Sequence, residues 1–101
     1  MTNNERINGM IGMAKAGGYV LCGENLAHRL TKRRIPVIIL ASDISGRAMR
    51  NLKTAMSDDQ ITIEYSTKEE LGRLISARPV NAIGINSAGI ARKIIDLRKE
   101  K

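Results

Sequence analysis

The sequence predicts an α/β fold: a three-layer α/β/α sandwich with a central, four-stranded mixed sheet. Helical patterns of apolar residues alternate with short apolar runs along all 101 residues. Right-handed crossovers between such strands place helices on both faces of one sheet. A chain of this length forms a single domain, residues 1–101, whose core is aliphatic because the sequence has no Trp or Phe and only two Tyr.

The first half of the chain is predicted to contain two helices and two strands. A capping box, Thr2 with Glu5, begins the first helix, and two glycines end it. Pro36 ends the second helix because proline forces the preceding residue into an extended backbone. The apolar run after Pro36 is unbroken, as in a strand buried on both faces. The expected elements are a helix up to Gly17-Gly18, a strand at 19–21, a helix at 25–34 and a strand at 37–41.

The second half is predicted to contain three helices and two strands. Ile61, Ile63 and Tyr65 alternate with polar residues, which indicates a half-exposed strand at the edge of the sheet. A second capping box, Thr67 with Glu70, begins the next helix. The expected elements are a helix at 48–56, the edge strand at 61–65, a short helix at 67–75 before Pro79, a strand at 80–85 and a helix around 90–95.

The formal charge of +7 is unevenly distributed along the chain. Five of the ten acidic residues lie between Asp58 and Glu70, so the remainder is strongly basic. One face can therefore be positive, which favours a polyanionic partner; a basic surface without a partner is the alternative. A single cysteine excludes an internal disulfide framework, and neither a secretory signal nor a membrane-spanning stretch is visible. These features predict a cytoplasmic, monomeric protein with no membrane partner.

Three short polar loops each follow an apolar run and precede a helical pattern. They are residues 22–25, 42–47 and 86–89. If the strands before them lie parallel, the three helix starts meet at the same edge of the sheet. Backbone N–H groups and the positive ends of the helix dipoles then face one side, as in sites that bind anions. This edge is the predicted ligand-binding surface.

Catalysis at this edge is not expected. The glycines fit neither the dinucleotide-binding fingerprint nor a P-loop. Cys22 and His28 are the only residues of their types, so an inert cysteine and a surface histidine are the simpler interpretation. Asp43 follows the central strand, where a general base could lie, but a carboxylate beside Ser45 more often accepts a hydrogen bond in a turn or cap. We therefore predict no enzyme activity, no metal and no cofactor.

The helix at 25–34 has residue types that suit RNA binding. Asn25 has a donor and an acceptor for a base edge, and Arg29 follows one turn later on the same face. Lys32 and Arg33 extend this cationic stripe towards phosphates. The alternative, equally good from spacing alone, is that Asn25 caps the helix and the cations form a solvated face. Proteins that bind single strands stack bases on aromatic rings, which are scarce here, so a folded RNA is the expected partner.

Four segments resemble, in this order and spacing, one family of RNA-binding proteins. They are GENLAHR at 23–29, VIILASD at 37–43, EELGRLI at 69–75, and IGI at 83–85 followed by Gly89. From about Ile7 to Ile95 the chain is similar to the kink-turn-binding ribosomal family L-seven-Ae/L-thirty-e, and most to its small bacterial YlxQ-like members. The resemblance implies the same sandwich and non-catalytic binding of kink-turn or ribosomal RNA, with ribosomal proteins as further partners.

The resemblance also implies roles for residues of the first loop. Gly23 lets the backbone approach RNA closely, and Asn25 contacts a base edge of tandem sheared G·A pairs. Arg29 replaces the Lys that is usual in the family. Leu26 stands where archaeal and eukaryotic members have Glu.

Further roles fall on the second and third loops. Asp43 shapes the second loop. From its position at a helix start, and not from the resemblance, Arg47 is expected to contact a phosphate. The segment from Ile85 to Gly89 matches a third loop, which packs against the protruding nucleotide. The expected RNA-binding residues are Gly23, Glu24, Asn25, Arg29, Lys32, Arg33, Asp43, Arg47, Ile85, Asn86, Ser87, Ala88 and Gly89.

Two other functions stay open on the sequence. An adaptor would bind a protein through the acidic window around the helix at 67–75, or through the edge strand that ends at Tyr65. A nucleotide-binding protein would hold a small phosphorylated ligand at the same three helix starts. Protein capture that survives nuclease treatment would favour the adaptor, and thermal stabilisation by nucleotides but not by RNA would favour the nucleotide-binding protein.

Overall fold

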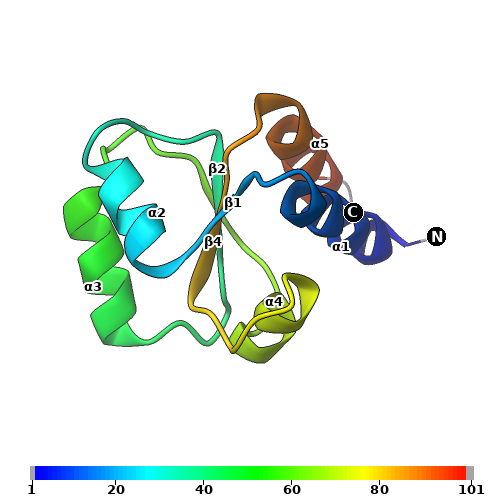
Figure 1. The fold of residues 1–101 in the computed structure, drawn as a ribbon, viewed down its shortest axis with the longest axis horizontal. Helices are drawn as coiled ribbons and strands as arrows, with labels where there is room; N and C mark the ends of the chain where they lie inside the picture. The colour runs from blue at the N-terminus through cyan, green and yellow to red at the C-terminus, as the bar shows by residue number, and fades with distance from the viewer. Residues whose placement is uncertain (1, 100–101) are drawn as a thin grey trace.

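The computed structural model of the protein describes residues 2–99. Helices and strands alternate in the predicted order (Figure 1). Across these residues, no helix has the length and apolarity that crossing a bilayer requires. The helices are α1 (Asn3–Ala16), α2 (Gly23–Leu30), α3 (Gly46–Ala55), α4 (Lys68–Leu74) and α5 (Ala88–Lys99), and the strands are β1 (Val20–Leu21), β2 (Val37–Leu40), β3 (Thr62–Glu64) and β4 (Ala82–Ile85).

The strands form one mixed sheet in the order β1-β4-β2-β3. β4 is antiparallel to both of its neighbours, β1 and β2, whereas β2 and β3 are parallel. Three strands therefore run in one direction and β4 runs in the other. We call the end of the sheet at which β1, β2 and β3 finish and β4 begins the lower end, and the opposite end the upper end, as they stand in Figure 1.

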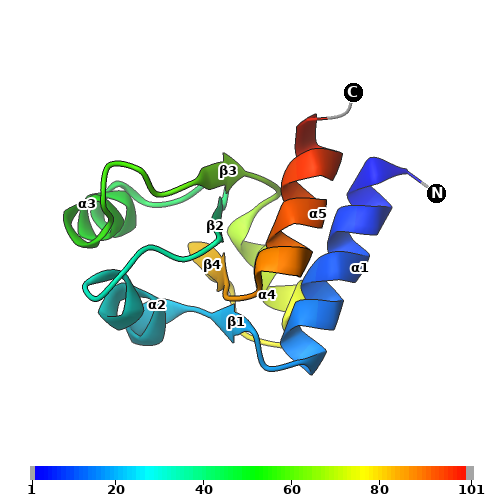
Figure 2. The same ribbon diagram turned by 90° about the horizontal axis from the view of Figure 1, so that it is seen from above.

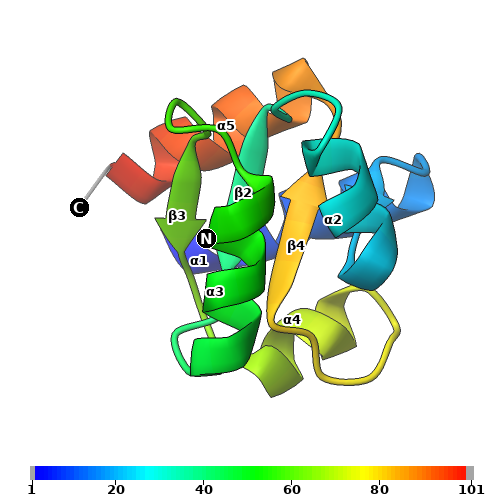
Figure 3. The same ribbon diagram turned by 90° about the vertical axis from the view of Figure 1, so that its left-hand side faces the viewer.

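Helices cover both faces of the sheet, so the predicted three-layer sandwich is confirmed. α2 and α3 lie side by side on one face, and α1, α4 and α5 lie on the other (Figures 1 to 3). Ile39 of β2 packs in the core beneath α1, α4 and α5, whereas the next residue along the pleat, Ile38, packs beneath α2 and α3. Both faces of β2 are thus buried, as its unbroken apolar run predicts.

The predicted helix starts are largely confirmed. Thr2 and Glu5 form the full capping box of α1, with two hydrogen bonds of 3.1 Å. Thr67 Oγ1 accepts from the Glu70 N–H at 3.2 Å at the start of α4. The Glu70 carboxylate binds Arg73 at 2.9 Å instead, so only half of the second box forms. Local polar spacing therefore located both helix starts correctly.

The predicted bounds of α2 are wrong at both ends. The helix begins two residues earlier than expected and ends at Leu30, before the basic residues that follow it. Thr31 Oγ1 donates to the His28 carbonyl at 2.7 Å and closes the last turn. The chain must then leave the helix because Ile35 is buried, with its backbone N–H and carbonyl both bonded to the Gln60 side chain. The contacts with Gln60 join residues that are 25 positions apart, so local sequence patterns could not predict where the helix ends.

Tyr65 ties the end of the edge strand to α1. Its hydroxyl, which has one proton to donate, lies 2.6 Å from Asn8 Oδ1 and 3.0 Å from the Asn4 carbonyl oxygen, so that either can accept it. Burial, and after it the negative charge of Glu70, raises the pKa of Tyr65 above its ordinary value. The folded state therefore favours the neutral phenol.

We expect Tyr65→Phe to lower the free energy of unfolding by about 0.5–1.5 kcal/mol, because it removes this donor. The raised pKa means that the phenol's contribution is present below the unfolded pKa, about 10, and is lost as the pH rises through the folded pKa. Urea unfolding between neutral and strongly alkaline pH should show the gap between parent and variant closing. Tyr19→Phe is the control, since Tyr19 is 45% exposed. A gap that stays constant across this pH range would contradict the prediction.

Candidate functional site

Two of the three predicted loops meet at the lower end of the sheet. The loop at 22–25 follows β1 and the loop at 42–47 follows β2, and both strands finish at this end. The loop at 86–89 lies at the upper end, because β4 runs in the opposite direction to β1 and β2. The expectation that all three helix starts share one edge is therefore wrong for Ile85–Gly89. The Asn86 N–H donates instead to the Tyr19 carbonyl, at 2.8 Å, on the upper side of β1.

A third segment, which was not predicted from the sequence, lies beside these two loops at the lower end. Residues 76–81 lead from α4 into β4 and arrive beside the two loops. The Ala41 N–H donates to the Asn81 carbonyl at 2.9 Å, and the Ser45 N–H donates to Asn81 Oδ1 at 3.1 Å. Asn81 thus joins this segment to the loop before α3. The only sequence-based indication of this segment was the prediction of a mixed sheet. If one strand is antiparallel to its neighbours, the segment before it lies at the end of the sheet where those neighbours finish.

Gly72 allows the same segment to pack closely on α4. A Cβ on Gly72 would lie 2.3 Å from the Arg78 carbonyl oxygen and 2.9 Å from the Pro79 Cα. The Val80 N–H donates to the Lys68 carbonyl at 3.1 Å and adds a second attachment to this helix. Arg78 is exposed on this segment and adds a cation to the lower end.

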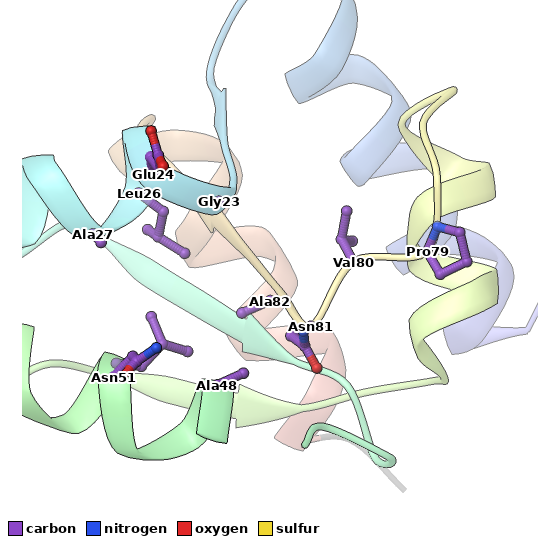
Figure 4. A pocket seen from close by; sticks show the side chains of 11 residues that line it. Gly23, Glu24, Leu26, Ala27, Ala48, Asn51, Pro79, Val80, Asn81 and Ala82 are labelled. Carbon is purple, nitrogen blue, oxygen red and sulfur yellow. The ribbon is translucent and has the colours of Figure 1, made fainter. Parts of the chain in front are cut away.

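A hollow of about 410 Å³, which we call the lower hollow, lies between the three segments at the lower end. Figure 4 shows it between the first turn of α2, the start of α3 and the chain from Pro79 to Ala82. Its walls are mostly aliphatic, and the side-chain amides of Asn51 and Asn81 supply hydrogen-bonding groups. The hollow can therefore accept a flat, partly apolar group with polar edges.

The first turn of α2 presents backbone donors beside this hollow. Cys22 is the N-cap residue and makes no side-chain cap hydrogen bond, while Gly23 has a φ of +58°. At α3, by contrast, Ser45 Oγ accepts from the Ala48 N–H at 3.1 Å. The first N–H groups of a helix have no intrahelical acceptor, and at α2 the N-cap side chain does not bind those of residues 23–25. This turn is the open helix start of the lower end.

Asn25 and Arg29 lie one turn apart on α2. Asn25 is exposed in the first turn, and Arg29 is half-buried. The alternative that Asn25 caps the helix is wrong, because Cys22 occupies the cap position. Contact of Asn25 with a base edge stays a prediction.

Leu26 belongs to the core rather than to the surface of α2. It is 2% exposed, and a Cβ on Gly84 would lie 2.6 Å from its Cδ1. Its side chain therefore packs α2 against β4, and the little surface that it leaves exposed forms part of the wall of the hollow. A carboxylate at this position would be buried without a partner, which is costly.

Lys32 and Arg33 do not continue the stripe on the helix as expected. Both follow the end of α2 and lie towards the upper end of the sheet, where β2 begins. The Arg33 N–H still donates to the Arg29 carbonyl, at 3.1 Å, so one further turn leads away from the lower end. The structure therefore divides the expected RNA-binding residues between two ends of the molecule.

Asp43 acts as a backbone acceptor, as its sequence context favours. Its Oδ1 accepts from the N–H of Lys68, the first residue of α4, at 2.8 Å. The carboxylate therefore holds the loop after β2 against the start of a different helix from its own. The predicted role as a hydrogen-bond acceptor is confirmed, but Ser45 rather than Asp43 caps α3, and the partner of Asp43 is 25 residues away.

Charge at the lower end is mixed rather than uniformly positive. Glu24 and Asp43 lie among Arg47 and Arg78, all of them exposed. Neither of these two arginines lies within 4.0 Å of a carboxylate in residues 2–99. Affinity for a polyanion at this end must therefore come from specific placement of donors more than from net charge.

No known family model matches the chain, and no curated protein matches it in sequence. Solved structures share its fold. One of them, a protein with unknown function from Bacillus halodurans, has a TM-score of 0.76 and 21% identity over 93% of this chain and 97% of its own. At this level of identity, the likeness supports the fold alone.

Proposed function

We propose that the protein binds a folded RNA at the lower end of its sheet and catalyses no reaction. The observation that supports this most is the open first turn of α2, whose N–H groups border the hollow without a capping side chain. Phosphate and base-edge oxygens are acceptors for such groups. Arg29, one turn further along, adds a charged donor for a base or a phosphate.

The hollow complements this turn. In the proposed complex, one unstacked base enters between α2, α3 and the segment at 76–81, where aliphatic walls cover its faces. The amides of Asn51 and Asn81 then meet its polar edge. Arg47 and Arg78 are exposed and adjoin in sequence the wall residues Ala48 and Pro79, and in the proposed complex they contact the phosphates on either side of that base.

The RNA that we propose is a kink-turn or another bent motif of ribosomal RNA. Its support is the family resemblance of the sequence, together with a shape that offers protruding bases to a hollow. The protein would act as a cytoplasmic, monomeric, ribosome-associated factor that stabilises the bent form. Leu26, buried here, excludes the carboxylate contact available to members with Glu at this position.

Arg29→Ala is expected to weaken binding to a kink-turn RNA by about 1–3 kcal/mol, because a base contact of this kind is worth that much. Affinity is measured by fluorescence anisotropy at several salt concentrations, with a straight duplex of the same length as the reference RNA. Lys15→Ala is the matched control, since it removes one exposed cation from the end of α1, on the opposite face of the sheet. Equal affinity of Arg29→Ala and the parent would count against the proposal.

Two experimental results would indicate that the ligand is not RNA. Thermal stabilisation by nucleoside triphosphates or inorganic phosphate, with none by RNA, would assign the open turn of α2 to a small phosphorylated ligand. Failure to bind either, with a protein partner that persists after nuclease treatment, would favour the adaptor function.

A further inference from the structure

The exposed side of α3 carries cations and no acidic residue. Among residues 2–99, α3 is the one helix whose sequence, GRAMRNLKTA, contains neither Asp nor Glu. Leu52 and Ala55 pack towards the sheet, whereas Arg47, Arg50 and Lys53 are exposed. We call these three exposed residues the cationic face of α3.

The charge of the cationic face is not compensated within residues 2–99, where no carboxylate lies within 4.0 Å of its three side chains. On α4 and α5, by contrast, arginines pair with acidic residues one turn away, at 2.9 and 3.6 Å. The acidic residues nearest to α3 in sequence, Asp43 and Asp58, lie before and after the helix, and Asp43 is bonded to the N–H of Lys68. The cationic face is therefore available to an external anion.

Gly46 lets the Arg50 side chain lie over the first turn of α3. A Cβ at Gly46 would lie 3.4 Å from Arg50 Nη1, so the guanidinium reaches back to the residue that precedes Arg47. Cations are unfavourable near the positive end of a helix dipole, and an anion bound between them relieves the repulsion. Ala48, in the same turn, lines the lower hollow. Positive charge thus gathers beside the hollow that receives the base.

The residue types of this face favour phosphates over an acidic protein. None of the large apolar side chains exposed in residues 2–99 lies on α3, although protein interfaces depend on such anchors at their centre. Arginine and lysine side chains are, by contrast, common donors to the phosphates of nucleic acids. α3 begins at the lower end and runs up the sheet for about 15 Å (Figure 3), so its cations can follow several nucleotides.

We infer that the cationic face of α3 binds the phosphate backbone of a double-stranded stem beside the base that enters the lower hollow. The inference rests on the function proposed above and extends it from the bound base to the flanking RNA. Arg47 and Arg50 contact the phosphates nearest to the base, and Lys53 contacts the strand farther along α3. Such contacts do not depend on base sequence, so they supply salt-dependent affinity, while the lower hollow and Arg29 supply selectivity.

The double variant Arg50→Gln/Lys53→Gln tests this inference, since Gln is polar and favours a helix. Affinity for a kink-turn RNA is measured over a range of salt concentrations, because the slope of log affinity against log salt counts phosphate contacts at about 0.9 each. The slope should become shallower by about 1.8 in the variant. Two further RNAs keep the bent motif and lack one stem each. One of them should give the parent this same shallow slope and should leave the slope of the variant unchanged.

The matched control is Arg6→Gln/Lys15→Gln, which removes two exposed cations from α1, on the other face of the sheet. Its slope should equal that of the parent, and circular dichroism confirms that each variant folds. The inference is overturned if Arg50→Gln/Lys53→Gln keeps the parent's slope, if the α1 control loses as much, or if neither shortened RNA reproduces the loss. In these cases a weakened Arg29→Ala would still support the proposed function. If the parent binds none of the RNAs, the proposed function fails and this inference fails with it.

Discussion

Gly72→Ala is expected to lower the free energy of unfolding by about 1–3 kcal/mol, the usual range for overpacking a well-packed contact. The new Cβ would lie 2.3 Å from the Arg78 carbonyl oxygen and 2.7 Å from its carbonyl carbon. Both atoms belong to the backbone, so no side-chain rotation relieves the contact. Either α4 or the segment at 76–81 must move. Urea unfolding followed by circular dichroism measures the loss.

The same substitution at Gly9 is the control for Gly72→Ala. Gly9 also lies within a helix, α1, and a Cβ there meets no atom within 4 Å. Gly9→Ala should therefore stabilise the protein by about 0.5–1 kcal/mol, through helix propensity alone. If the same substitution destabilises the protein at Gly72 and stabilises it at Gly9, the difference can be attributed to the close contact with the Arg78 carbonyl. If Gly72→Ala were neutral or stabilising, the packing of this segment on α4 would be wrong.

Gly72→Ala also has a functional consequence that separates it from a merely destabilised variant. The segment that must move forms one wall of the lower hollow. Under conditions in which the variant is fully folded, its affinity for a kink-turn RNA should be lower than that of the parent. Gly9→Ala should bind as the parent does, because α1 lies on the other face of the sheet.

Ile39→Ala is expected to lower the free energy of unfolding by about 2–5 kcal/mol, the range for truncating a buried aliphatic side chain. Ile39 is 0% exposed and lies in the middle of β2, between β3 and β4. Helices close over it on that face, so the space left by the lost methyl groups cannot be filled from solvent. The total stability of a domain this size is of order 5–15 kcal/mol, so the variant is partly unfolded at moderate urea concentrations.

Ile61→Ala provides the comparison for this prediction. It removes the same atoms from a side chain that is 45% exposed and should cost less than about 1 kcal/mol. Both variants are measured by urea unfolding at one temperature. Because both replace Ile with Ala, the difference between the two losses in free energy of unfolding mainly reflects burial. Similar losses for the two variants would mean that β2 is not the centre of the core.

Local interactions explain why much of the fold was predictable from the sequence. Thr2 and Glu5 are three residues apart, so their capping box is visible in the sequence and present in the structure. The apolar run of β2 and the alternation in β3 also depend on neighbours, and both strands occur as expected. Hence the order of the elements, the buried central strand and the edge strand could be predicted.

The candidate site was only partly predictable, for a reason that β4 illustrates. An isolated apolar run contains no signal of its direction, which depends on pairing with β1 and β2 far away in sequence. The direction of β4 brings Asn81 and Arg78 to the lower end and takes Asn86 to the upper end. The end of α2 was missed for a similar reason, since the Gln60 side chain that binds Ile35 is 25 residues away.

The sequence by itself determined which segments are helices and strands, which strand is buried on both faces, and which helices begin at a polar cap. Only the tertiary structure decided which helix starts share an end of the sheet, which segment completes the lower hollow, and that Lys32 and Arg33 lie near the other end. The physical reason is how far apart in the sequence the interacting residues lie. Caps and periodic burial depend on residues within one or two turns, whereas strand direction and loop position depend on hydrogen bonds and packing between residues that come together only when the whole chain folds.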